Sequence, residues 1–195
     1  MKYTELKNDI AVSDRRIYLL EGEDAYFRAH GEEQVKRAFL SMPELNFASF
    51  DGGALKGKQI ENLTSAMAAY PFMAEKRVIR VGEFYPSEAD YDKYLKAAFE
   101  NCPPSTILVI VNQSAGKGAQ LKRKKCITYV DCSRADEDTV TRWVYATLKR
   151  AGIYADVSAC RNVAAYCLCD MSRVEGEVEK LKLLGKDRLS AADID

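Results

Sequence analysis

Five short segments, either apolar or alternating between apolar and polar residues, have lengths typical of β-strands and recur along the first two-thirds of the sequence. They cover residues 17–20, 46–50, 78–81, 107–111 and 127–130. The fourth run is apolar at every position. That pattern is typical of a central strand in a parallel sheet whose two faces are both covered. The runs therefore predict a sheet with its centre near residues 107–111.

The segments between these runs have the spacing of apolar residues that helices show. This spacing predicts helices over residues 24–40, 60–67 and 87–99, with Pro43 and Pro71 as the points beyond which the first two cannot continue. Strand and helix alternate throughout this part of the chain. The alternation predicts an α/β fold, in which a mainly parallel five-stranded sheet forms the middle of three layers.

The pattern changes after the fifth strand. Three carboxylates at 136–138 stand where a helix begins, which suits the helix dipole. Only helical periodicity follows, with three helices and the start of a fourth near Ser190. Gly152 and Gly185 suit the ends of the first and third helices. The sequence thus predicts an α/β domain over 1–135 and a small helical-bundle domain over 136–195.

Composition narrows the function classes. The chain has 195 residues, of which 47% are hydrophobic, and its 29 Lys and Arg balance its 29 Asp and Glu. A net charge of zero excludes binding to nucleic acid or anionic lipid through the net charge of the whole chain. It does not exclude binding through a local basic patch. The longest apolar stretch, Thr106–Val111, is far shorter than the roughly 20 residues that span a bilayer. Charged residues also interrupt the N-terminal region. We therefore expect a cytoplasmic protein with no membrane partner.

The six cysteines do not form a metal-binding pattern. They are scattered, no CxxC pair occurs, and Cys167 and Cys169 form only a CxC. The sole histidine, His30, is far away in sequence. Since a structural zinc ion needs four well-placed ligands, buried and reduced thiols are the better interpretation. We expect neither a metal nor a cofactor.

A phosphate-binding loop is missing after the first strand. Such a loop needs the pattern GxxxxGK[ST], but Gly22–Phe27 has one glycine, no lysine and two carboxylates. The segment Ser114–Gly118 contains a Gly-Lys pair, but it follows a late strand and lacks the spacing, so we expect a flexible polar loop. No GxGxxG or GxSxG occurs, and His30 lies among charged residues. We therefore expect no intrinsic enzymatic activity and no catalytic residue.

Two segments remain that could bind a partner. The first is a basic run of four residues, Lys122, Arg123, Lys124 and Lys125. It is either a solvated face before a strand or a contact for nucleic acid or an acidic partner. The second contains Phe72 and Met73, directly after Pro71. Periodicity alone favours core positions for this pair. Alternatively, the two side chains project from the turn that ends the helix and bind in an apolar groove of a partner protein.

Several segments are not diagnostic of a protein family one by one, but their order and spacing together are fairly specific. They are Ile17–Asp24, Asn46-Phe47 with Phe50–Gly52, Pro71–Ile79, Pro103-Pro104 before Thr106–Val109, Trp143 with Gly152-Ile153, and Glu177–Leu181. In this order and spacing they resemble the delta subunit of the bacterial DNA polymerase III clamp loader, over essentially all of the chain. The resemblance implies an AAA+-like first domain without its phosphate loop and a lid-like helical second domain. It also implies that the family's third domain, a helical collar, is absent from this chain.

The resemblance also implies a function. In the family, delta binds the ring-shaped sliding clamp (the beta subunit) and props one interface open with a hydrophobic pair. In this sequence the pair falls on Phe72 and Met73, after Pro71. The implied partners are the clamp, the gamma/tau and delta-prime subunits of the loader, and primed DNA within the complex. ATP would act through the neighbouring subunits, and the basic run would contact DNA phosphates.

The sequence departs from the family at two places. Met73 stands where a second aromatic residue is common, and Cys169-Asp170-Met171 replaces a turn that contains glycine. The leading hypothesis is a non-catalytic, clamp-binding subunit of the replicase. One alternative is a nucleotide-binding, AAA+-related ATPase with a non-standard phosphate loop. Another is an α/β adaptor with a helical tail and an unrelated partner.

Overall fold

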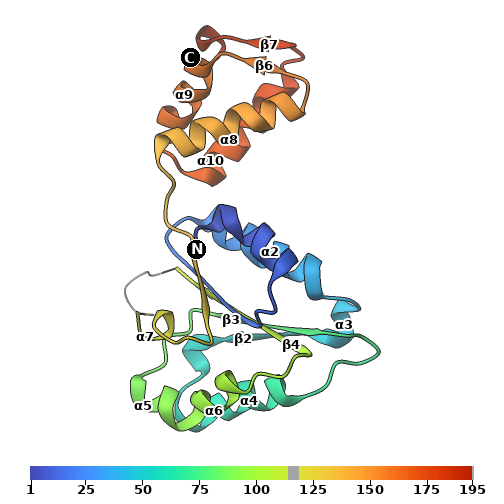
Figure 1. Cartoon of the computed structure of the whole chain (residues 1–195). Coiled ribbons are helices and arrows are strands. Elements are labelled where there is room, and N and C mark those ends of the chain that lie inside the picture. Colours follow the sequence, from blue (N-terminus) through green and yellow to red (C-terminus); the bar gives the residue numbers. More distant parts are fainter. Residues whose placement is uncertain (114–118, 195) are drawn as a thin grey trace. The chain divides into compact units, whose positions relative to one another are not determined.

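A computed structural model of the chain describes residues 1–113 and 119–194 (Figure 1). The segment Ser114–Gly118, expected to form a polar loop, lies outside the described residues. The chain divides into two compact units. Unit 1 comprises Met1–Glu23 and Phe27–Ser133, and unit 2 comprises Asp24–Tyr26 and Arg134–Asp195.

Unit 1 is built on a five-stranded sheet of order β2-β3-β4-β1-β5 in which every pairing is parallel. The strands are β1 (Ile17–Glu21), β2 (Phe47–Asp51), β3 (Arg77–Gly82), β4 (Thr106–Asn112) and β5 (Thr128–Asp131). All five predicted strands are confirmed, each with its ends within one residue of the prediction. Strand β4 lies at the centre and is buried at every position, as its uninterrupted apolar run predicts.

Helices cover both faces of this sheet, so the predicted three-layer architecture is confirmed (Figure 1). On one side lie η1 (Tyr3–Glu5), α1 (Leu6–Val12), α2 (Ala25–Phe39) and α3 (Pro43–Asn46). On the other lie α4 (Ile60–Ala68), α5 (Glu88–Asp90), the π-helical turn η4 (Tyr91–Leu95) and α6 (Lys96–Glu100). Short turns η2 (Gly52–Ala54), η3 (Gly57–Gln59) and α7 (Ala119–Lys122) complete the unit. The main apolar core contains Leu19 and Ile110 of the sheet together with Leu63 of α4.

Two helical predictions in unit 1 are confirmed, with local detail that the sequence pattern does not show. The helix predicted over 87–99 is present as a continuous helical stretch in which the π-helical turn η4 lies between α5 and α6. Ser87 caps its start by accepting a hydrogen bond from the Asp90 N–H at 3.0 Å. Tyr91, Leu95 and Phe99 all reach the core, and the wider π turn keeps their four-residue spacing on one face. Helix α2 ends at Phe39, before Pro43 as predicted, and Pro43 then occupies the first turn of α3, where its missing N–H costs nothing.

Unit 2 contains the three predicted helices, α8 (Glu137–Arg150), α9 (Val157–Tyr166) and α10 (Met171–Leu183). Asp136 caps α8, because its side chain accepts a hydrogen bond from the Thr139 N–H at 2.7 Å. Gly152 and Gly185 adopt φ values of +80° and +65°, which suits their predicted roles at helix ends. In the same unit, Asp24 accepts a hydrogen bond from the Met171 N–H at 3.4 Å.

The expectation of helices alone in this part of the chain is wrong. Strands β6 (Tyr154–Ala155) and β7 (Arg188–Leu189) pair in parallel as a second, two-stranded sheet. Two residues are too few to display the alternation by which a strand is recognised in a sequence. The fourth helix expected near Ser190 is a single 3₁₀ turn, η5 (Ala191–Asp193), closed by hydrogen bonds between Ser190 and Asp193.

The turn between α9 and α10 contains backbone strain. Leu168 and Cys169 have φ values of +53° and +55°, a conformation that costs a residue with a Cβ roughly 1–2 kcal/mol. We expect Cys169→Gly to raise the free energy of unfolding by about 0.5–1 kcal/mol, because the gain exceeds glycine's entropic cost in the unfolded chain. Urea denaturation checks this, with Ser172→Gly as the matched control. Ser172 lies in the first turn of α10, where glycine should destabilise. A lower stability of Cys169→Gly would show that the thiol's contacts outweigh the strain.

Candidate functional site

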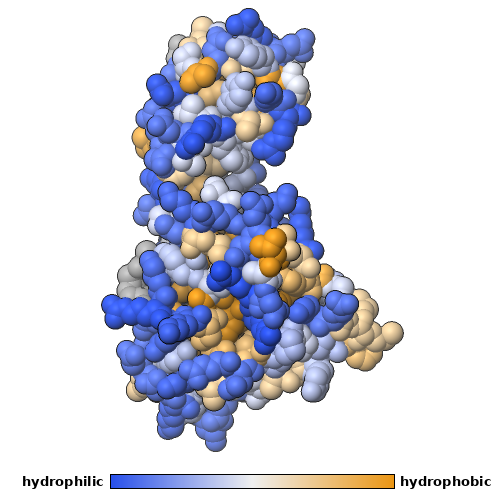
Figure 2. Space-filling view, in the orientation of Figure 1, coloured by the Kyte–Doolittle hydropathy of each residue, from blue (hydrophilic) through white to orange (hydrophobic). Residues whose placement is uncertain are grey.

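The loop between α4 and β3 presents large apolar side chains to solvent. Phe72 is 57% exposed, Met73 80% and Tyr70 88%. Leu45, in α3, is 51% exposed and precedes Asn46, whose side chain bonds to Phe72. We call Leu45, Tyr70, Phe72 and Met73 the apolar tip. Figure 2 shows hydrophobic colouring at the projecting right-hand end of unit 1, where Figure 1 places α3 and this loop. The structure thus contradicts the interpretation of Phe72 and Met73 as core residues.

A single buried side chain fixes the backbone of this loop. Asn46, at the end of α3, is fully buried. Its Oδ1 accepts a hydrogen bond from the Phe72 N–H at 2.7 Å, and its Nδ2 donates to the Phe72 carbonyl at 3.0 Å. The same Nδ2 donates to the carbonyl of Ser41, also at 3.0 Å. The amide therefore holds Phe72 as a neighbouring strand would, from a position 26 residues earlier in the chain.

Further hydrogen bonds fix the two ends of the loop. The Lys76 Nζ donates to the Pro104 carbonyl at 2.6 Å, and the Arg77 guanidinium donates to the Ala69 carbonyl at 3.3 Å. Met73 has a φ of +48°, which turns the chain sharply at the tip. Pro71, half-buried, leads into this turn. Because the backbone is already ordered, a partner that binds the apolar tip would lose little conformational entropy in doing so.

The basic run is only partly available to a partner. The Lys122 Nζ lies 3.8 Å from the centroid of the Tyr129 ring, and the Lys124 Nζ lies 4.1 Å from that of Tyr91. Lys124 also pairs with Glu88 at 3.3 Å. These cation–π and ionic contacts hold two of the four side chains against unit 1. Lys122, Arg123 and Lys125 are exposed, whereas Lys124 is half-buried.

Close contacts hold the carboxyl ends of β1, β4 and β5, next to the crevice of the sheet. A Cβ on Gly22 would lie 2.1 Å from the Cys132 carbonyl carbon, so the loop after β1 packs directly on the end of β5. At the end of β4, the Asn112 side chain bonds to both the N–H and the carbonyl of Phe84, at 2.9 and 3.0 Å. Ligands of open α/β sheets bind in this crevice. Equilibrium dialysis against ATP, rather than these strand-end contacts, tests the nucleotide-binding alternative.

The thiols and the histidine show no arrangement typical of a reactive site. Burial raises the pKa of the Cys102 thiol to about 11, so that this thiol stays protonated at neutral pH. In the described part of the chain, no group of three His, Cys, Asp or Glu side chains is placed to hold a metal ion. His30 lines a groove of about 650 Å³ together with Lys7 and Phe39.

Within residues 1–113 and 119–194, no helix has the length and apolar character needed to cross a membrane.

Solved structures of known proteins share this fold. The Bacillus subtilis DNA clamp loader delta protein (YqeN) matches with a TM-score of 0.70 and 14% identity, over 98% of this chain and 61% of that one. The Thermotoga maritima RuvB Holliday junction branch migration motor matches with a TM-score of 0.60 and 12% identity, over 98% of this chain and 66% of that one. The chain thus has an AAA+-like fold, and it spans 61% of the length of the clamp loader delta protein.

The family follows from the sequence. The family described as DNA polymerase III, delta subunit, matches residues 18–131, which is more than half of the chain. The chain therefore belongs to the DNA polymerase III delta subunit family, and the resemblance seen in its sequence is confirmed. A search of the curated proteins gave no match.

Proposed function

We propose that this chain is a non-catalytic clamp-loader component that binds the sliding clamp through Phe72 and Met73, with Pro71 shaping the loop. Membership of the delta family supports the role, as does the fold shared with a protein described as a DNA clamp loader delta protein. The observation that carries the site is the exposure of two large apolar side chains on a loop braced by a buried amide.

Burial energetics are consistent with this role. Seating Phe72 and Met73 in an apolar pocket of the clamp would contribute roughly 3–6 kcal/mol before ordering costs. If the pocket is better formed in the open ring, part of this free energy shifts the clamp toward the open state. No hydrolysis in this chain is required for that step. ATP would act through the gamma/tau and delta-prime subunits, which complete the proposed set of loader partners.

The basic run is proposed as a weaker contact for DNA phosphates or an acidic partner within the loader. Arg123 and Lys125 are the members to test, because both are exposed, whereas Lys122 and Lys124 each lie over a tyrosine ring. A phosphate contact made by these two side chains would weaken as salt increases.

Titration of the cognate sliding clamp with this chain, followed by calorimetry, tests the proposal directly. We expect saturable binding, and an absence of binding at micromolar concentrations would overturn the function. Equilibrium dialysis against ATP and magnesium tests the nucleotide-binding alternative, for which we expect no measurable affinity. If the clamp does not bind, a partner recovered from a bacterial lysate would favour the adaptor alternative.

A further inference from the structure

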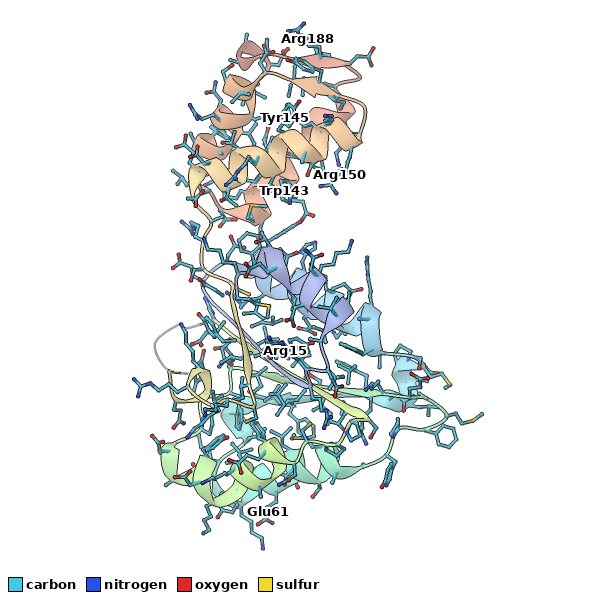
Figure 3. All side chains as sticks on the ribbon, in the orientation of Figure 1. Arg15, Glu61, Trp143, Tyr145, Arg150 and Arg188 are labelled. Atoms are coloured by element: carbon cyan, nitrogen blue, oxygen red, sulfur yellow. The ribbon has the colours of Figure 1, made fainter. Side chains whose placement is uncertain are left out.

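A small pocket in unit 2 shares no residue with the apolar tip or the basic run. It forms where α8 ends and the chain turns at Gly152 into β6, and its volume is about 190 Å³. Figure 3 labels Tyr145 and Arg150 on α8, and Arg188 by the strand pair of the same unit. The lining residues are Tyr145, Lys149, Gly152, Ile153 and Tyr154.

Aromatic side chains make up much of the pocket wall. Tyr145 comes from α8 and is half-buried, and Tyr154 comes from β6 and is 52% exposed. Ile153, which is buried, adds an apolar side chain to the lining of the pocket. The pocket is smaller than the cavities of about 300–1,000 Å³ that take drug-sized ligands. It therefore suits one flat ring system, held by stacking on tyrosine.

A cationic side chain lies beside each of the two tyrosine rings. The Lys149 Nζ lies 5.9 Å from the centroid of the Tyr145 ring, and the Arg188 guanidinium lies 4.9 Å from that of Tyr154. Arg150 is exposed beside Lys149 at the end of α8. Asp156 offsets part of this charge, because it pairs with Arg188 at 3.3 Å. Aromatic rings interleaved with cations are what single-stranded nucleic acid uses, through base stacking and phosphate contacts.

We propose that this pocket binds single-stranded nucleic acid, with a base stacked on Tyr154 and Tyr145 and the flanking phosphates near Lys149, Arg150 and Arg188. A duplex keeps its bases stacked on each other and offers no free ring to the pocket. A free nucleotide would reach one ring and one cation, whereas a strand brings successive phosphates to cations spread over α8 and β7. This inference does not depend on clamp binding.

Fluorescence anisotropy of the whole chain with a labelled oligothymidylate of about a dozen nucleotides tests the proposal. We expect Tyr154→Ala to weaken binding about tenfold, and Tyr154→Phe to bind as the unmodified chain does because the ring is kept. Lys149→Gln should reduce the slope of log affinity against log salt by about 0.7, the value for one phosphate contact on a single strand. Tyr166→Ala is the matched control, since Tyr166 is 66% exposed in the same unit but does not line the pocket.

Four results would overturn the proposal. The chain would bind no oligothymidylate, or Tyr166→Ala would weaken binding as much as Tyr154→Ala does. Thymidine monophosphate would compete as effectively as the strand, which would indicate a free nucleotide as the ligand. Finally, an Arg123→Gln, Lys125→Gln variant would abolish binding while Tyr154→Ala left it intact, which would place the contact on the basic run of unit 1. Circular dichroism of each variant separates loss of binding from loss of folding.

Discussion

Replacing Phe72 and Met73 together with alanine should weaken binding to the sliding clamp by about a hundredfold or more, or about 3 kcal/mol. The reason is that both side chains are exposed, at 57% and 80%, so each is free to be buried by a partner. Truncation to alanine removes the apolar surface that the complex would bury, but it leaves the packing of the core of this chain unchanged. Calorimetry measures the loss, and an unchanged midpoint of urea unfolding should accompany it.

The matched control removes the same kind of side chain elsewhere. Val12 and Leu183 are each 86% exposed, and neither belongs to the apolar tip. A Val12→Ala, Leu183→Ala double variant should bind the clamp as the unmodified chain does. Equal losses in the two double variants would mean that binding follows general surface hydrophobicity, and the assignment of Phe72 and Met73 would fall.

The two anchor positions should not contribute equally. Phe72 is a rigid ring whose backbone is held by Asn46, whereas Met73 has an unbranched, flexible side chain. A flexible side chain loses more rotamer entropy when it is buried. We therefore expect the larger share of the loss to come from Phe72→Ala, and replacing Met73 with phenylalanine offers a way to tighten the complex.

The fold could be predicted from local pattern because its signals are local. The apolar runs of β1 to β5, the capping carboxylate of Asp136 and the glycines after α8 and α10 each act within a few residues of themselves. Strands β6 and β7 escaped prediction because they pair only two residues across a separation of 34 positions. Register between such short segments depends on packing that no local window contains.

The candidate site was harder to predict for the same physical reason. Whether Phe72 is core or surface depends on Asn46, 26 residues away, and a buried asparagine leaves no periodic signal in a sequence. The basic run likewise looks like one uniform patch, yet Lys122 and Lys124 lie over the rings of Tyr129 and Tyr91. The local sequence pattern was sufficient to predict the segments that could bind a partner. Contacts with residues distant in the sequence determine which side chains of those segments are exposed for binding.

Asn46→Ala should destabilise the protein by about 2–4 kcal/mol, although it removes only a few atoms. The substitution deletes three hydrogen bonds, to the Phe72 N–H, the Phe72 carbonyl and the Ser41 carbonyl. It leaves those backbone groups without their side-chain partner, and the cost of such groups exceeds the net value of a hydrogen bond. Urea denaturation measures the change. Asn101→Ala is the control, because Asn101 is exposed and makes a single side-chain bond within its own helix turn, to Ala97, so about 0.5 kcal/mol or less is expected.

The same variant separates the shape of the tip from its composition. Asn46→Ala keeps Phe72 and Met73 but releases the backbone that carries them, so the complex must order the loop at its own cost. We expect clamp affinity, measured under conditions where the variant stays folded, to fall about tenfold. Asn46→Asp should behave similarly, because a carboxylate accepts from the Phe72 N–H but cannot donate to either carbonyl. If the affinity of both variants stayed unchanged while their stability fell, the brace would serve folding alone, and the clamp would recognise Phe72 and Met73 without a preformed loop.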